Sequence, residues 1–228
     1  IAISGIATAI ITRFDPDPPV ADAIQEQFED AAKAAGVSYS CKTICRETSS
    51  LLQSATELSQ LYSLNLVAQP DRSRPSNDDQ LTETLLLGSG RPLLVVPYID
   101  RRSFSARRIV ICWDGRSAAA RAVHDAMPFL HKAAGIDILV VDRDRTIAMN
   151  TPEALKDHLA RSGLNADVHY LFSHTSNIYD MILSFGADVG ADMLVMGGYG
   201  HSRLRERVLG GVTRGILETM TVPVLISH

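Results

Sequence analysis

Glycine residues crowd one stretch of the sequence, MGGYGHSRLRERVLGGVTRG (196–215), which holds six of the chain's fifteen glycines. Gly197 and Gly200 precede a basic segment, and the adjacent pair Gly210 and Gly211 follows it. Backbone without side chains can bend tightly, and its N–H groups can then surround an anion. The stretch therefore predicts a phosphate-binding loop, although a plain strand-to-helix turn is the simpler alternative for the first two glycines.

Polar side chains accompany these glycines. His201, Ser202 and Arg203 lie between the two glycine pairs, and Thr213 follows the second pair. Each of the four offers a hydrogen-bond donor to a phosphate, and we interpret His201 as such a donor rather than as a catalytic group. The spacing matches neither G-x-x-x-x-G-K-[ST] nor a G-x-G-x-x-G placed after a first strand.

Strands and helices must position this loop. The second half of the chain alternates short apolar runs with amphipathic segments, which predicts a parallel sheet with helices on both faces. The expected strands are 107–114, 136–141, 166–172, 191–197 and 222–227, and the expected helices are 116–135, 151–163, 176–190 and 203–219. Ligands of such doubly wound domains bind beyond the carboxyl ends of the strands, where the glycine stretch lies.

The first half repeats this order. Its expected strands and helices match those of the second half from the second strand onward, and LLLGSGRPLLVVP (85–97) aligns with ILETMTVPVLIS (216–227). An equivalent of residues 107–135 is missing at the front, and the opening IAISGIATAI has neither Met nor a leader. We therefore expect a sequence that begins inside the first of two tandem doubly wound domains, 1–104 and 105–228.

Composition excludes several function classes. The formal net charge of −4 gives no reason to expect nucleic acid or an anionic membrane as partner. No apolar run reaches the roughly 18 residues that a membrane span needs. Three cysteines are too few and too irregular for a disulfide framework. We expect a cytoplasmic protein with reduced cysteines, whose own side chains bind no metal.

The motifs resemble those of one known family. Gly197-x2-Gly200-x9-Gly210-Gly211 is similar to the nucleotide loop of the universal stress protein family, written G-x2-G-x9-G-[ST]. VICWDGRSAAARAVHDAM (110–127) resembles the first strand and helix of that family, and VPVLIS resembles its last strand. The resemblance covers essentially the whole chain as a tandem member. It implies two five-stranded parallel sheets of the adenine-nucleotide α-hydrolase-like type and ATP as ligand, with or without Mg²⁺.

The resemblance also implies a role for each matching position. Asp114 and Gly115 would lie beside the adenosine, and Val140 and Val141 would line the adenine slot. The phosphates would be held by Gly197, Gly200, His201, Ser202, Arg203, Gly210, Gly211, Val212 and Thr213. Gly211 departs from the pattern, because the family has Ser or Thr there, so a hydroxyl donor is missing unless the threonine two residues later compensates.

The first copy departs much further. We align Gln69 with Gly197, and Pro70 and Pro75 lack the N–H donors that a phosphate loop needs. Asp79 in the same segment would repel phosphate. We expect at most one nucleotide site per chain, in the second copy, with a structural or regulatory role for the first.

These inferences favour an ATP-binding stress-response or regulatory protein. Two alternatives stay open, namely a structural or adaptor protein with a decayed site and a slow ATPase. Catalysis is disfavoured because Glu206 and Asp114 are the loop's nearby carboxylates, and neither suits both activation of water and metal binding. We expect the two halves to form an intrachain pseudo-dimer through PLLVVP and VPVLIS, and we consider a homodimer through the same final strands.

Overall fold

The computed structural model describes residues 6–13, 18–45, 48–69, 78–99, 104–142, 150–172, 177–198 and 211–228. The chain forms two compact units, Ile1–Leu61 and Tyr62–His228. This division falls inside the first sequence repeat. The repeat boundary between residues 104 and 105 therefore remains a proposal about how the sequence is organised.

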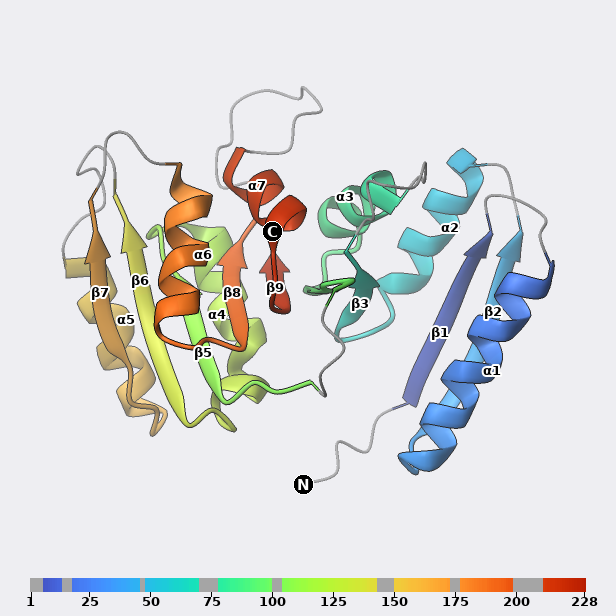
Figure 1. Cartoon of the computed structure of the whole chain (residues 1–228), viewed down its shortest axis with the longest axis horizontal. Helices are drawn as coiled ribbons and strands as arrows, with labels where there is room; N and C mark the ends of the chain where they lie inside the picture. The colour runs from blue at the N-terminus through green and yellow to red at the C-terminus, as the bar shows by residue number, and fades with distance from the viewer. Residues whose placement is uncertain are drawn as a thin grey trace. The chain divides into compact units, whose positions relative to one another are not determined.

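The smaller unit contains two parallel strands and two helices (Figure 1). Its elements are β1 (Ile6–Arg13), α1 (Pro18–Ala34), β2 (Ser38–Cys45) and α2 (Thr48–Ser59). The strands pair along their whole length, from Ile6 with Ser38 to Arg13 with Cys45. On α1, Phe28 meets the ring of Tyr39 edge-on, with 6.0 Å between ring centroids. The expected strand–helix–strand–helix order of this segment is confirmed.

The larger unit is built on a seven-stranded sheet of order β3-β4-β9-β8-β5-β6-β7. Its first three elements are β3 (Asn65–Ala68), α3 (Asp78–Gly88) and β4 (Leu93–Val96). The rest are β5 (Arg108–Cys112), α4 (Ser117–Leu130), β6 (Gly135–Val141), α5 (Asn150–Arg161), β7 (Asp167–Leu171), α6 (Ile178–Asp188), β8 (Met193–Gly197), α7 (Gly211–Thr219) and β9 (Val224–Ser227). Every neighbouring pair is parallel except β4 and β9. The doubly wound five-stranded parallel arrangement predicted for the second half is therefore confirmed for β5 to β9.

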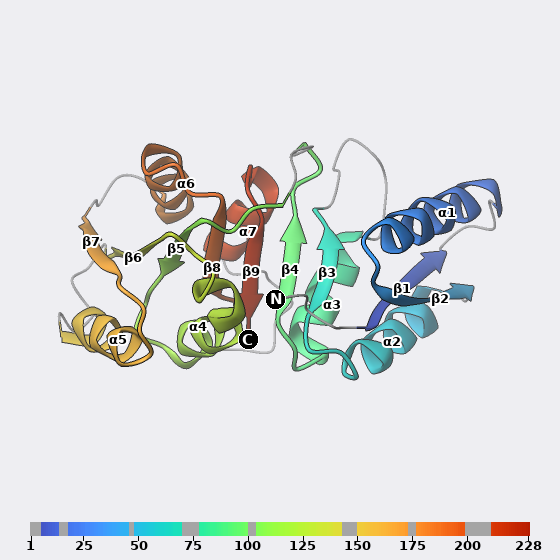
Figure 2. The same ribbon diagram turned by 90° about the horizontal axis from the view of Figure 1, so that it is seen from below.

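Helices cover both faces of this five-stranded part. Figure 2 shows α4 and α5 on one face and α6 and α7 on the other. Side chains of β5, β6 and β8 that face α4 and α5 form the main core, and they alternate with residues that face the opposite helices. The fully buried members of this core include Ile109, Ile111, Ile138, Met193 and Val195. Strands buried on both faces explain the continuous apolar runs of the sequence.

The two sequence halves meet where β4 pairs with β9. Leu93 lies opposite Ile226, and Val95 lies opposite Val224, in an antiparallel ladder. The intrachain pairing predicted from PLLVVP and VPVLIS is therefore present. Because β9 lies between β4 and β8, it offers no open edge to a second chain. A homodimer through the final strands would need edges that the chain itself already uses.

Backbone hydrogen bonds correct one alignment between the halves. The amide of Asn65 donates to the carbonyl of Pro92, as that of Leu194 donates to the carbonyl of Pro223. Asn65 is thus the equivalent of Leu194, which makes Gln69 the equivalent of Gly198 rather than of Gly197. The alignment made from sequence was one residue out, because short apolar strands carry little information on register.

The strands of the first half lie in two separate sheets. In the second half β5 lies between β6 and β8 and joins them into one sheet. β1 and β2 form a two-stranded sheet of their own, whereas β3 and β4 belong to the sheet of the second half. In the described part of the chain, no helix has the length and apolar character of a transmembrane segment.

Candidate functional site

The carboxyl end of β5 turns sharply into α4. The strand ends at Cys112, and the amide of Trp113 still donates to the carbonyl of Leu139 at 2.8 Å. Asp114 follows, and its Oδ1 accepts a hydrogen bond from the amide of Arg116 at 3.0 Å. This bond is an Asx turn that fixes the entry to the helix, in which Arg116 itself is the N-cap. One of the two carboxylate oxygens of Asp114 is therefore used by the turn.

The other carboxylate oxygen of Asp114 is available. Asp114 is exposed, and within the described parts of the chain its Oδ2 accepts no hydrogen bond. Gly115 follows with a φ of 74°, a left-handed conformation that favours glycine. The turn therefore presents a carboxylate oxygen at the carboxyl edge of the sheet, where doubly wound domains bind ligands.

Strand β6 extends beyond the end of β5. The carbonyl of Leu139 faces β5, because it accepts from Trp113, whereas Asp142 faces β7, because its amide donates to Leu171. Hydrogen-bonding directions alternate along a strand, so the N–H and C=O of Val141 point to the same side as those of Leu139. On that side β5 has already ended. Val141 therefore directs one donor and one acceptor toward the region beside the β5–α4 turn.

Val140 has a different environment. Its side chain is only 1 % exposed, and its backbone points toward β7 by the same alternation. It belongs to the packed sheet, while Val141 is half-buried. Of the two valines predicted to line the adenine slot, Val141 is the one that turns backbone groups toward the site.

Gly197 brings the end of β8 against the first turn of α4. A Cβ atom at this position would lie 2.5 Å from the amide nitrogen of Ala119 and 2.7 Å from the carbonyl carbon of Ala118. Only glycine permits that approach. The close packing holds β8 beside the turn that carries Asp114, so the ends of β5 and β8 lie at one place.

The amino end of α7 carries three further residues of the predicted site. Gly211 begins this helix and is exposed, with open space around the position of an added Cβ. Val212 is half-buried. The side chain of Thr213 is buried, with Thr213 4 % exposed, and in the described part of the molecule its hydroxyl forms no hydrogen bond.

The structure thus brings together part of the predicted set. Asp114, Gly115 and Val141 lie at the ends of β5 and β6, Gly197 at the end of β8, and Thr213 in α7. The remaining loop residues, Gly200, His201, Ser202, Arg203 and Gly210, lie outside the described residues, as do positions 203–210 of the predicted helix 203–219. Their assignment to phosphate remains a prediction.

Two further residues, Cys112 and Trp113, lie directly before Asp114 at the turn. Trp113 packs against the main core, and its indole N–H donates to Thr151 Oγ1 at 3.3 Å, which ties the start of α5 to the turn. Beneath the turn, burial and the nearby Asp114 carboxylate raise the pKa of the Cys112 thiol to about 12. That thiol is protonated at neutral pH. Hydrophobic periodicity carries no signal for such contacts between loops.

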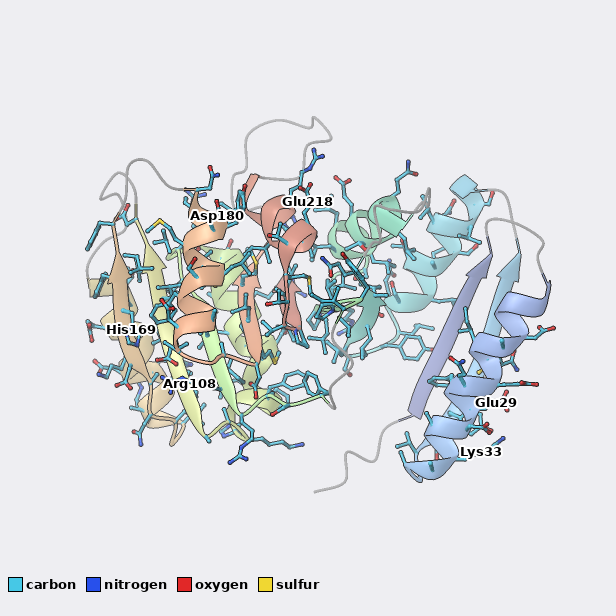
Figure 3. All side chains as sticks on the ribbon, viewed as in Figure 1. Glu29, Lys33, Arg108, His169, Asp180 and Glu218 are labelled. Carbon is cyan, nitrogen blue, oxygen red and sulfur yellow. The ribbon has the colours of Figure 1, made fainter. Side chains whose placement is uncertain are left out.

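A second polar cluster lies at the opposite, amino end of the strands. Asp137 is 1 % exposed, and its carboxylate accepts two hydrogen bonds from Arg108, at 2.9 and 3.1 Å, and pairs with His169 Nε2 at 2.9 Å. Figure 3 labels Arg108 and His169 on β5 and β7. The cluster fastens β5, β6 and β7 together. Because a parallel sheet binds ligands at its carboxyl edge, we assign this cluster a structural role.

The fold and the location of the site define a doubly wound α/β protein with a candidate ligand site at the switch between β5, β6 and β8. Residues 105–228 match the sequence model of the universal stress protein family. This chain belongs to the universal stress protein family.

Individual relatives agree with this assignment. Over 149 residues, the chain is 25% identical to Universal stress protein Slr1230 of Synechocystis sp., covering 63% of this chain and 49% of that relative. The chain therefore spans about half the length of the curated relative it matches.

Solved structures show the same fold. A universal stress protein from Archaeoglobus fulgidus covers 98% of this chain, with 88% of its own length matched, at a TM-score of 0.69 and 17% identity. A putative universal stress protein from Pseudomonas aeruginosa covers 99% of this chain, with 93% of its own length matched, at a TM-score of 0.65 and 16% identity. At these identities the likeness concerns the fold alone.

Proposed function

We propose that this protein binds ATP together with Mg²⁺ at one site per chain, in residues 105–228, and acts as a nucleotide-responsive stress or regulatory protein. The site would lie at the carboxyl ends of β5, β6 and β8 and at the amino end of α7. The observation that carries the proposal is the backbone edge of Val141 beside Asp114, which no strand covers among the described residues.

The Val141 edge is suited to adenine. Its N–H can donate to a ring nitrogen, and its C=O can accept from the neighbouring amino group, which are the groups that adenine presents side by side. Guanine presents a carbonyl oxygen and a ring N–H on the corresponding edge, so its polarity is reversed. The arrangement therefore favours ATP over GTP.

Asp114 and α7 complete the proposed contacts. The open Oδ2 of Asp114 can accept hydrogen bonds from ribose hydroxyls. The amides in the first turn of α7, the dipole of this helix and the buried Thr213 hydroxyl, which has no partner among the described residues, suit the phosphates. Among the described residues, no group of three or more His, Cys, Asp or Glu side chains could hold a metal. Mg²⁺ would accordingly arrive bound to the phosphates, as is usual for this ion.

A thermal-shift titration of the full chain tests the proposal. Ligand binding to the native state raises its apparent stability, and saturation at about 100 times Kd contributes about 2.7 kcal/mol. We expect Mg·ATP to raise Tm by several degrees and Mg·GTP to raise it less. No stabilisation at millimolar Mg·ATP would contradict the proposal and favour the structural or adaptor alternative, in which Gly211 marks a decayed site.

A further inference from the structure

One buried polar side chain of the first half reaches across to the helix α7. Gln69 follows β3 and is 4 % exposed. Its Nε2 donates to the carbonyl of Leu217 at 2.9 Å, and its Oε1 accepts from the amide of Tyr98 at 3.4 Å. The backbone N–H of Gln69 donates to the carbonyl of Val96 at 2.7 Å. Gln69 thus joins the ends of β3 and β4 to α7.

The bond to Leu217 meets a specific need of the helix. The last carbonyls of an α-helix lack donors from a following turn. The amide of Met220 donates to Ile216, but α7 ends at Thr219, so the carbonyl of Leu217 has no amide of its own helix to accept from. Gln69 supplies that donor from a segment 148 residues away in the sequence.

The second half has no side chain at the equivalent position that could form the same contact with α3. Gly198 is the equivalent of Gln69, and a Cβ there would lie 2.9 Å from Ile226 Cγ2 and 3.0 Å from Leu86 Cδ2. Leu86 of α3, which corresponds to Leu217 of α7, lies directly against Gly198 and leaves no room there for a longer side chain. The interface between the halves is therefore asymmetric, and its polar brace acts on the helix that carries Gly211 and Thr213.

We propose that Gln69 is a positioning residue: by capping α7 from the first half, it holds the amino end of that helix in place for phosphate. The role in binding rests on the proposed function. The role in holding α7 does not, because it concerns the mobility of the helix without ligand. The first half, for which the sequence predicts no phosphate loop, would thereby contribute to the site of the second half.

Hydrogen–deuterium exchange of the full chain without ligand tests the brace. Gln69→Leu keeps the side-chain volume but removes both side-chain bonds, and loss of a buried hydrogen bond should increase local opening of α7 by about tenfold. We expect faster exchange over 212–220 and little change in β6. The matched control is Gln80→Leu, on an exposed position of α3, which should leave α7 unchanged. A folded Gln69→Leu protein with wild-type exchange over 212–220 would overturn the proposal.

Gln69→Glu provides a second test if the leucine variant fails to fold. A protonated Glu can donate to Leu217 and accept from Tyr98 as Gln does, whereas an ionised one cannot donate. The Tm deficit of this variant relative to wild type should therefore shrink as the pH falls from about 8 to about 5, since burial raises a carboxyl pKa. A deficit that does not change with pH would count against the capping role.

Nucleotide affinity separates this inference from the proposed function. If wild type binds Mg·ATP, Gln69→Leu should bind it about threefold to tenfold more weakly, in proportion to the population with α7 displaced. Unchanged affinity together with faster α7 exchange would overturn the link to phosphate. If wild type binds no nucleotide, the proposed function fails, and the exchange experiment still decides whether Gln69 braces α7.

Discussion

Gly197 and Ala119 are packed so closely that a Cβ atom on Gly197 would lie 2.5 Å from the Ala119 amide nitrogen. The end of β8 therefore rests directly on the first turn of α4, two adjoining elements that both border the proposed site. This gives Gly197 a role in packing that is independent of any ligand. A loss of binding on mutating Gly197 would consequently say little about phosphate.

Gly197→Ala should destabilise the protein without any ligand present. The added methyl meets backbone atoms, which cannot move aside as a flexible side chain would. Overpacking of this kind costs about 1–3 kcal/mol. Urea unfolding measures the change. Gly211→Ala is the control, because a Cβ there meets nothing within 4 Å, and it should be neutral or slightly stabilising. Equal stability of the two variants would contradict the close packing.

Gly211→Ser should strengthen nucleotide binding. The position is exposed, stands at the start of α7 and has room for a side chain. A serine hydroxyl there would restore the donor that the family pattern has at this position, and one hydrogen bond to a charged group should raise affinity by about tenfold. Calorimetric titration with Mg·ATP provides the measurement, with Gly211→Ala as the variant that adds bulk but no donor. An affinity equal to that of wild type would show that phosphate does not approach this residue.

Asp114→Asn should separate folding from binding. The amide oxygen of Asn can still accept from Arg116 and keep the Asx turn. Its NH₂ group replaces the second oxygen and cannot accept from ribose. We expect unchanged stability and about a tenfold loss of Mg·ATP affinity, the effect of one hydrogen bond to a charged group. Asp114→Ala should lower both the stability and the Mg·ATP affinity, because it removes the Asx turn as well as the ribose contact. If Asp114→Asn binds Mg·ATP like wild type, the carboxylate serves the turn alone.

Cys112 should resist alkylation while the protein is folded. Burial and the nearby Asp114 carboxylate raise the pKa of its thiol to about 12. Its thiolate fraction at about pH 8 is then about 1 in 10,000, and iodoacetamide reacts with thiolates. Mass spectrometry should find Cys112 modified only after unfolding in urea. Rapid modification of Cys112 in the native protein would contradict the burial of its thiol.

The same pKa shift predicts a dependence of stability on pH. The unfolded chain loses the Cys112 proton near pH 9, and the folded protein keeps it, so the contribution to stability falls as the pH rises above that value. Between about pH 8 and about pH 10, wild type should lose about 1 kcal/mol more stability than Cys112→Ala. If the free energies of unfolding of wild type and Cys112→Ala, measured in urea, change equally with pH over this range, the pKa shift is excluded.

Hydrophobic periodicity predicted the elements of the second half well. The strand expected at 107–114 is β5 (Arg108–Cys112), and the one expected at 136–141 is β6 (Gly135–Val141). The pairing of the two halves also followed from sequence, because PLLVVP and VPVLIS are apolar strands with a shared proline. These features depend on local patterns that a single sequence contains.

The remaining features depend on contacts between distant segments. The alignment of β3 with β8 from sequence was one residue out, so Gln69 was aligned with Gly197 instead of Gly198. Its hydrogen bond to Leu217 was not predicted. The open edge of Val141 arises only because β6 extends past β5 in the sheet. Likewise, the glycine at 197 was assigned to phosphate, whereas its packing against α4 becomes visible only in three dimensions.

Isothermal titration calorimetry of the full chain with Mg·ATP is the most direct test of the nucleotide site, because it gives both affinity and stoichiometry. We predict saturable binding with one nucleotide per chain, weakened by Asp114→Asn. Two equivalent sites would contradict the assignment to the second half alone. No binding heat at several temperatures, together with no shift in Tm, would contradict the nucleotide site itself.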